Sequence, residues 1–215
     1  MQILVKSAGI IDRDSPHHQQ VVDIFIQDGK IERIGTGLEY DEHTQVIESE
    51  SLYVSKGWLD AQVYVADPGE EHREDILSIS KAASAGGFTT IAMMPNTNPA
   101  IHSKTEIEYV LNKSAGLITS VLPVGALSKN TAGKDLTEMQ DMFEAGAVAF
   151  SDGYHPVKNI GLLKNALLYA KAFGGVVLTH PEDESMSSGG LIHEGMSSLL
   201  MGVDGLPVES EHMLS

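Results

Sequence analysis

From residue 58 onward the sequence repeats one pattern, in which a short apolar segment is followed by a loop and then by an amphipathic segment. Apolar segments typical of buried strands lie at 57–63, 89–94, 118–124, 147–151 and 176–179. Segments with helical periodicity lie between them, at 73–85, 104–111, 135–145 and 161–172. Strands that alternate with helices of this length require right-handed crossovers, so we predict an α/β fold with a parallel sheet.

Residues 1–56 have a different pattern, with short β-type segments separated by polar turns. These segments lie at 2–5, 21–26, 31–34 and 44–47. Asp28-Gly29 joins the second to the third, and Gly29 tolerates the positive φ that a tight hairpin turn needs. We therefore expect part of a small β-sandwich before a domain boundary near residue 57.

The number of strand–helix units bears on whether the fold is complete. Five such units do not close an eight-stranded barrel, and an open parallel sheet exposes apolar edges and faces to water. The last residues, 211–215, carry neither a helix stop nor a turn signal. We therefore expect this chain to be part of a longer protein.

The charge of the chain excludes several classes of partner. Its 30 Asp and Glu against 14 Lys and Arg give a net charge of −16, which opposes binding to nucleic acid or to anionic membranes. There is no basic, apolar leader at the N-terminus and no apolar run of about 18 residues, so we expect neither export nor membrane insertion. The chain has no cysteine, which is compatible with a cytoplasmic protein and leaves His, Asp and Glu as strong metal ligands.

Several motifs along the chain match one enzyme family. They are Gly57-Trp58-Leu59-Asp60, Asp67-Pro68-Gly69 with Glu71-His72-Arg73-Glu74-Asp75, Ala85-Gly86-Gly87-Phe88-Thr89-Thr90, Met94-Pro95-Asn96-Thr97-Asn98-Pro99, the run from Glu144 to Asp152, His180-Pro181-Glu182-Asp183 and His193-Glu194-Gly195. Together they closely resemble class I dihydroorotases of the amidohydrolase superfamily. The resemblance covers nearly the whole chain, and the run from Met94 to Pro99 is the most specific motif.

This resemblance implies a fold and an activity. It implies a TIM-type β/α barrel beside a small β-sandwich made from both chain ends. Residues 1–56 would then be the N-terminal part of the sandwich, and residues 57–215 the first part of the barrel, about five βα units, without its C-terminal strands. The implied reaction is reversible hydrolysis of the cyclic amide dihydroorotate to carbamoyl aspartate in pyrimidine biosynthesis, with zinc providing hydroxide. The family's catalytic base, an aspartate on the last strand, would lie beyond Ser215.

The positions of the family's first two zinc-binding histidines hold Gln62 and Tyr64. Residues two apart on a strand face the same side, so both side chains should point into the barrel mouth. An amide oxygen is a weak ligand and a phenol has a pKa of about 10, so neither replaces a neutral imidazole well. Ala66 stands where the family has an arginine that clamps the substrate carboxylate. We therefore predict that zinc is weakly bound or absent and that catalysis is impaired or lost.

Three residues still match functional positions of the family. Asn96 matches a substrate-binding asparagine, while Asp152 and His180 match ligands of the second metal and are vestigial candidates for that role. Each also has a structural interpretation. Asn96 can brace its own loop, Asp152 can cap a turn before Gly153, and His180 can be a hydrogen-bonded histidine at a strand end.

Two functions remain open. One is a dihydroorotase-type cyclic amidohydrolase of pyrimidine biosynthesis, and the other is a non-catalytic homologue kept as a structural or regulatory partner, for example of aspartate carbamoyltransferase. The replacements at Gln62, Tyr64 and Ala66 favour the second for this molecule. In either case we expect a homo-oligomer.

Overall fold

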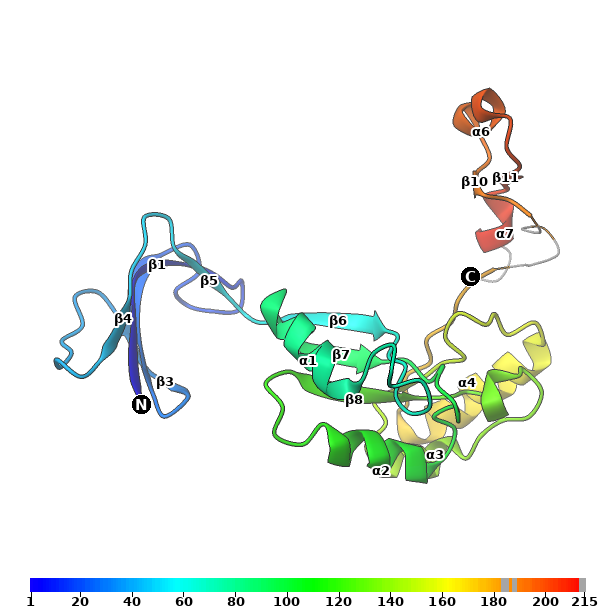
Figure 1. Cartoon of the computed structure of the whole chain (residues 1–215), viewed down its shortest axis with the longest axis horizontal. Coiled ribbons are helices and arrows are strands. Elements are labelled where there is room, and N and C mark those ends of the chain that lie inside the picture. The colour runs from blue at the N-terminus through cyan, green and yellow to red at the C-terminus, as the bar shows by residue number, and fades with distance from the viewer. Residues whose placement is uncertain (183–185, 187–188, 213–215) are drawn as a thin grey trace. The chain divides into compact units, whose positions relative to one another are not determined.

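The computed structural model of the chain describes residues 1–182, 186 and 189–212 (Figure 1). The chain divides into two compact units, Met1–Gly57 and Trp58–Ser215. Within the described residues, no helix is both long and apolar enough to cross a membrane.

The first unit is a five-stranded sheet with the order β3-β2-β1-β4, in which β5 also pairs with β1. Its strands are β1 (Gln2–Ile11), β2 (Val21–Gln27), β3 (Lys30–Gly35), β4 (Gln45–Ile47) and β5 (Tyr53–Ser55). The predicted hairpin joins β2 to β3 with Gln27 opposite Lys30, and its two turn residues, Asp28 and Gly29, have φ of 50° and 78°. Ile10, Val22 and Ile24 form the core of this unit.

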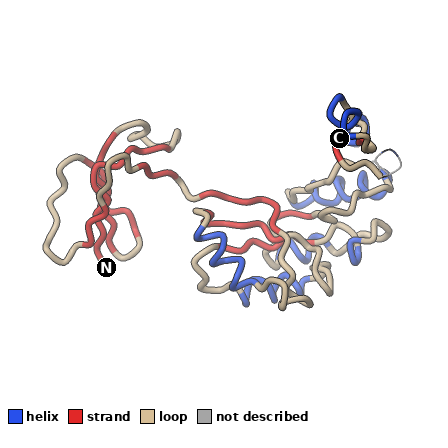
Figure 2. Tube along the Cα trace, turned by 45° about the horizontal axis from the view of Figure 1, so that its top comes forward, coloured by secondary structure: helices blue, strands red, loops and turns tan. Residues whose placement is uncertain are grey.

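The second unit contains a parallel sheet with the order β6-β7-β8-β9. Figure 2 shows strands of this unit running side by side with helices next to them. Its strands are β6 (Trp58–Val63), β7 (Phe88–Met93), β8 (Ser120–Gly125) and β9 (Ala149–Phe150). The predicted fifth strand is present as a single parallel bridge from Phe150 to Val177. This arrangement confirms the predicted partial β/α barrel.

The helices of this unit follow its strands. They are α1 (Ile76–Ala85), α2 (Lys104–Lys113), the 3-10 turn η1 (Lys129–Thr131), α3 (Met139–Glu144) and α4 (Ile160–Phe173). The last described segments are β10 (Ile192–His193), α6 (Met196–Met201), β11 (Gly205–Leu206) and α7 (Glu209–His212), with β10 and β11 paired in parallel.

Two helices begin later than the sequence pattern predicts. The α1 helix starts after Asp75, whose carboxylate accepts a hydrogen bond from the backbone of Ser78 at 2.6 Å, so that residue 75 is the N-cap. The α3 helix starts at Met139 because the preceding residues pair with the loop after β8. Thr137 Oγ1 donates to the carbonyl of Ala126 at 2.7 Å.

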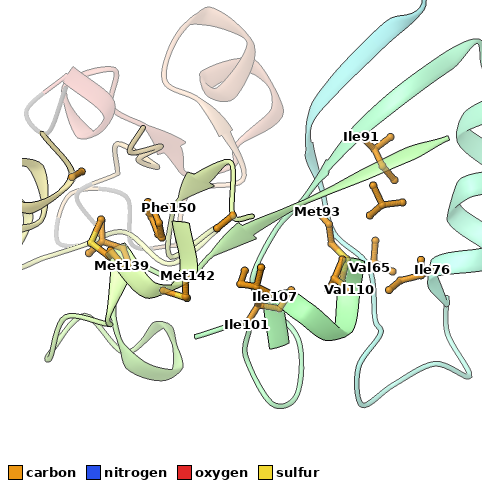
Figure 3. Close-up of a cluster of buried hydrophobic side chains, with 14 of the residues drawn as sticks. Val65, Ile76, Ile91, Met93, Ile101, Ile107, Val110, Met139, Met142 and Phe150 are labelled. Carbon is orange, nitrogen blue, oxygen red and sulfur yellow. The ribbon is translucent and has the colours of Figure 1, made fainter. Parts of the chain in front are cut away.

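The main core lies between the sheet and its helices (Figure 3). Ile91 and Met93 of β7 belong to it, together with Ile107 and Val110 of α2. The intervening residue Ala92 and the following Met94 belong to a second, smaller cluster with Val124 and Ala149. Alternate residues of the strand therefore face opposite sides of the sheet, which places the helices on one side and the barrel interior on the other.

Candidate functional site

A cavity of about 670 Å³ lies at the carboxyl ends of β6, β7 and β9, where β/α barrels carry their chemistry. Its wall is formed by the segments that follow these strands together with the turn η1. The lining residues are Tyr64, Val65, Ala66, Glu70, Arg73, Glu74, Asn96, Thr97, Asn98, Pro99, Ala100, Asn130, Thr131, Tyr154 and His155. Of the site residues predicted from sequence, the wall includes Tyr64, Ala66 and Asn96.

Gln62 and Tyr64 lie together at the end of β6, as strand alternation predicts. Val63 and Val65 pack into the main core, so the two polar side chains project from the opposite face. The Nε2 of Gln62 donates a hydrogen bond to the Tyr64 hydroxyl oxygen at 2.9 Å. The two side chains that replace the family's zinc-binding histidines are therefore hydrogen-bonded to each other.

Two aromatic residues after β9 extend this surface. The rings of Tyr64 and Tyr154 have centroids 5.3 Å apart, and those of Tyr154 and His155 have centroids 4.4 Å apart. Tyr154 and His155 are not among the site residues predicted from the sequence. Their position directly after Asp152-Gly153, at the end of a barrel strand, is the sequence feature that could have indicated them.

Asp152 is almost completely buried. Its carboxylate is hydrogen-bonded by Ser128 and does not line the cavity. Its Oδ1 accepts from the backbone N–H of Ser128 at 2.8 Å, and its Oδ2 accepts from the Ser128 hydroxyl at 2.5 Å. Burial raises the pKa of Asp152, and the hydrogen bonds from Ser128 offset this only in part. Both oxygens of the carboxylate thus serve to hold the loop after β8.

Asn96 connects the loops after β7 and β9. Its Nδ2 donates to the carbonyl oxygen of Asp152 at 3.0 Å, while its Oδ1 is buried without a hydrogen-bond partner. Gly153 leaves space for this amide, because a Cβ at that position would lie 1.6 Å from Asn96 Oδ1. The hydrogen bond to Asp152 therefore supports the structural interpretation of Asn96, in which its side chain braces a loop. The residue also lines the cavity.

His180 lies away from the cavity wall, with its side chain 43% exposed. Its Nε2 is 3.2 Å from Oε2 of Glu182, so the two side chains form a local pair. Asp183, which belongs to the same sequence motif, lies outside the described residues.

An ionic network around the buried Asp67 supports the loop that carries Glu70, Arg73 and Glu74. Asp67 accepts hydrogen bonds from Lys113 Nζ at 2.9 Å, from the Tyr109 hydroxyl at 2.7 Å and from a backbone N–H of α1 at 3.0 Å. Burial opposes ionisation of Asp67, but these donors outweigh it and hold its pKa below the usual value. The same contacts raise the pKa of Lys113 despite its partial burial.

Whether a metal ion fits this site can be judged from the side chains at the positions where the family resemblance implies metal ligands. In the part of the chain that the structure describes, no three His, Asp or Glu side chains come together in a group able to hold a metal ion. Gln62 directs its amide nitrogen at Tyr64, both carboxylate oxygens of Asp152 are bound by Ser128, and His180 pairs with Glu182. These side chains do not fit the zinc site that the family resemblance implies.

Comparison with solved structures defines the class of fold. The L-hydantoinase (dihydropyrimidinase) from Arthrobacter aurescens superposes with a TM-score of 0.76 at 22% identity, over 99% of this chain and 48% of that one. A D-hydantoinase from a Thermus species gives a TM-score of 0.65 at 23% identity, also over 99% and 48%. The fold is therefore that of the amidohydrolase β/α barrels.

Sequence comparison narrows the class to a family. Residues 52–215 match the dihydro-orotase-like family. The dihydroorotase of Geobacter metallireducens is 39% identical over 212 residues, and that of Citrifermentans bemidjiense is 40% identical over 212 residues. Both alignments cover 98% of this chain and 50% of the relative, so the chain spans about half the length of the curated relatives it matches. The chain belongs to the dihydroorotase-like family.

Proposed function

We propose that this protein is a cytoplasmic dihydroorotase-like protein of pyrimidine biosynthesis that has lost metal-assisted hydrolysis of the cyclic amide. The observation that carries the proposal is the hydrogen bond from Gln62 to Tyr64, at the position where the family resemblance implies two zinc-binding imidazoles. Two histidines there would each present a neutral nitrogen to the metal, whereas here the Gln62 amide donates to the Tyr64 hydroxyl oxygen and neither side chain has such a nitrogen.

The anion-binding part of the implied site is also altered. Ala66 lines the cavity with a methyl group where the resemblance implies a guanidinium that binds the substrate carboxylate at two points. The two changes are chemically independent. Loss of the histidines removes the metal that polarises the substrate carbonyl, and loss of the arginine removes the group that binds the substrate carboxylate. Together they support a large fall in catalytic rate and in affinity for the anionic substrate.

The test is metal content and turnover of the purified full-length protein that contains this chain, after zinc has been added and excess zinc removed. We expect much less than one zinc per chain and no hydrolysis of dihydroorotate above background. The matched comparison is the variant Gln62→His, Tyr64→His, Ala66→Arg, in which we expect zinc binding to increase. Stoichiometric zinc in the unaltered chain, together with zinc-dependent turnover, would contradict the proposal.

A second candidate function, as a structural or regulatory partner of aspartate carbamoyltransferase, is supported by an apolar surface on α4. Ile160, Leu167 and Leu168 are 66%, 50% and 59% exposed, and they line a shallow apolar groove. Exposed apolar groups gathered on one face favour a protein contact. Co-elution of the two purified proteins, weakened by Leu168→Glu, would support this function. A homo-oligomer that does not co-elute with the carbamoyltransferase would contradict it.

A further inference from the structure

The cavity has an acidic charge balance, which bears on what it can bind. Among its lining residues, one arginine stands against two glutamates. That arginine, Arg73, already forms an ion pair with Glu70, while Glu74 forms no salt bridge with a described residue. The surrounding chain carries a net charge of −16, which further disfavours an anionic ligand.

The wall of the cavity offers two aromatic rings and a hydrogen-bond donor. Tyr64 and Tyr154 supply the rings, at a centroid separation of 5.3 Å and with 47° between the ring planes, so a bound ring can stack on one and contact the edge of the other. Because Gln62 donates to the oxygen of the Tyr64 hydroxyl, the phenol's own proton remains available to another acceptor. The carboxylate of Glu74 lies in the same wall and can accept a hydrogen bond from an N–H group.

We propose that this cavity binds an uncharged cyclic amide or imide in place of the anionic dihydroorotate. The ring lies against Tyr64 and Tyr154, the Tyr64 hydroxyl donates to a ring carbonyl, and Glu74 accepts from a ring N–H. The inference rests on the proposed function in one respect, since Gln62 and Tyr64 must be free of metal for the phenol to act as a donor.

Two probes that differ by one carboxylate test this assignment. Dihydrouracil is dihydroorotate without its carboxylate, so calorimetric titration of the full chain with each isolates the effect of the charge. We expect dihydrouracil to bind about tenfold more tightly than dihydroorotate, because the anion meets excess acidic charge and, among the described lining residues, no unpaired arginine or lysine. Equal affinities, tighter binding of dihydroorotate, or no binding of dihydrouracil at millimolar concentration would each overturn the proposal.

Variants separate the contacts involved. Tyr64→Phe keeps the ring and removes the hydroxyl, so dihydrouracil affinity should fall about fivefold, the effect of one neutral hydrogen bond. The matched control is Tyr53→Phe in the first unit, which should leave affinity unchanged. Ala66→Arg should raise dihydroorotate affinity about tenfold or more through a charge-assisted contact while changing that for dihydrouracil little. An unchanged affinity in Tyr64→Phe would refute the assigned donor.

The metal content of each titrated sample keeps this inference separate from the proposed function. If zinc is present and dihydroorotate binds more tightly, both ideas fail. If the chain is free of zinc and dihydrouracil does not bind, the proposed function survives and the binding assignment is wrong. If zinc is present and dihydrouracil still binds more tightly, the loss of metal and the Tyr64 donor are both wrong, and only the preference for an uncharged ring stands.

Discussion

Replacing Asp67 with asparagine should destabilise the barrel unit far more than an ordinary loss of charge. Asp67 has no exposed surface, and its carboxylate is bound by Lys113 and Tyr109. The substitution Asp67→Asn keeps the size of the side chain, removes its charge and turns one acceptor into a donor that faces these two groups. The perturbation is therefore confined to one buried site.

The magnitude follows from what the substitution leaves behind. Breaking a fully buried ion pair costs about 3–5 kcal/mol, because the remaining charge is left unpaired. The Lys113 side chain is 38% exposed, so water screens its charge and lowers the expected loss to roughly 2–3 kcal/mol. A matched control is Glu108→Gln, also a carboxylate-to-amide change on a lysine partner, in an exposed pair whose N–O distance is 3.5 Å. That pair should contribute less than about 0.5 kcal/mol.

Urea unfolding followed by tryptophan fluorescence measures this difference as a free energy. Trp58 is the chain's one tryptophan, and it packs edge-on against Phe88 at a centroid distance of 5.9 Å. With an m value of about 2 kcal/mol/M, Asp67→Asn should lower the urea midpoint by roughly 1–1.5 M. A shift no larger than that of Glu108→Gln would refute the reasoning.

The effect should also depend on pH with a definite sign. Because the folded-state pKa of Asp67 is lowered, its contribution to stability is present above the unfolded value of 3.8 and is lost as pH falls through the folded pKa. The difference between the two proteins should therefore be constant from neutral pH down to about 4 and shrink below it.

Other consequences of the structure can be checked with the same assay. Asp152 has a raised folded pKa, so the unaltered protein should gain stability relative to Asp152→Asn as pH falls through that value, and a loss would contradict the assigned burial. Gly69→Ala places a Cβ 1.9 Å from the carbonyl oxygen of Asn98 and should cost more than about 2 kcal/mol, whereas Gly133→Ala, also at a positive φ but with open space around it, should cost about 1 kcal/mol. Phe150→Ala empties a fully buried position and should cost about 3–5 kcal/mol, measured by the urea midpoint.

The order of strands and helices in the barrel unit could be predicted because each element carries its own local signal. Strand β7 ends in three consecutive buried apolar residues, Ile91, Ala92 and Met93, and α2 and α4 lie close to their predicted bounds. The three-residue strand β5 was not predicted, because its pairing with β1 joins residues far apart in the sequence. The predicted starts of α1 and α3 were wrong, because a cap or a tertiary contact, such as that of Thr137, determines where the first turn begins.

In the candidate site, too, contacts between residues close in sequence could be predicted and contacts between distant residues could not. Gln62 and Tyr64 could be placed together because strand alternation is local. Tyr154 reaches Tyr64 through the path of the loop after β9, and Asp67 meets Lys113 across 46 residues of sequence. Neither contact has a periodic signature, so only the folded chain brings these groups together.

The scaffold of the cavity and its chemistry have separate physical origins. Asp67 is a buried charge whose desolvation is offset by Lys113 and Tyr109, and this network holds the loop of Glu70, Arg73 and Glu74 in place. It includes neither Gln62 nor Ala66, so changes at those two positions leave the cavity wall supported. A site built in this way can exchange metal and anion ligands for an aromatic surface without losing its shape, which is why ligand binding and hydrolysis must be measured separately.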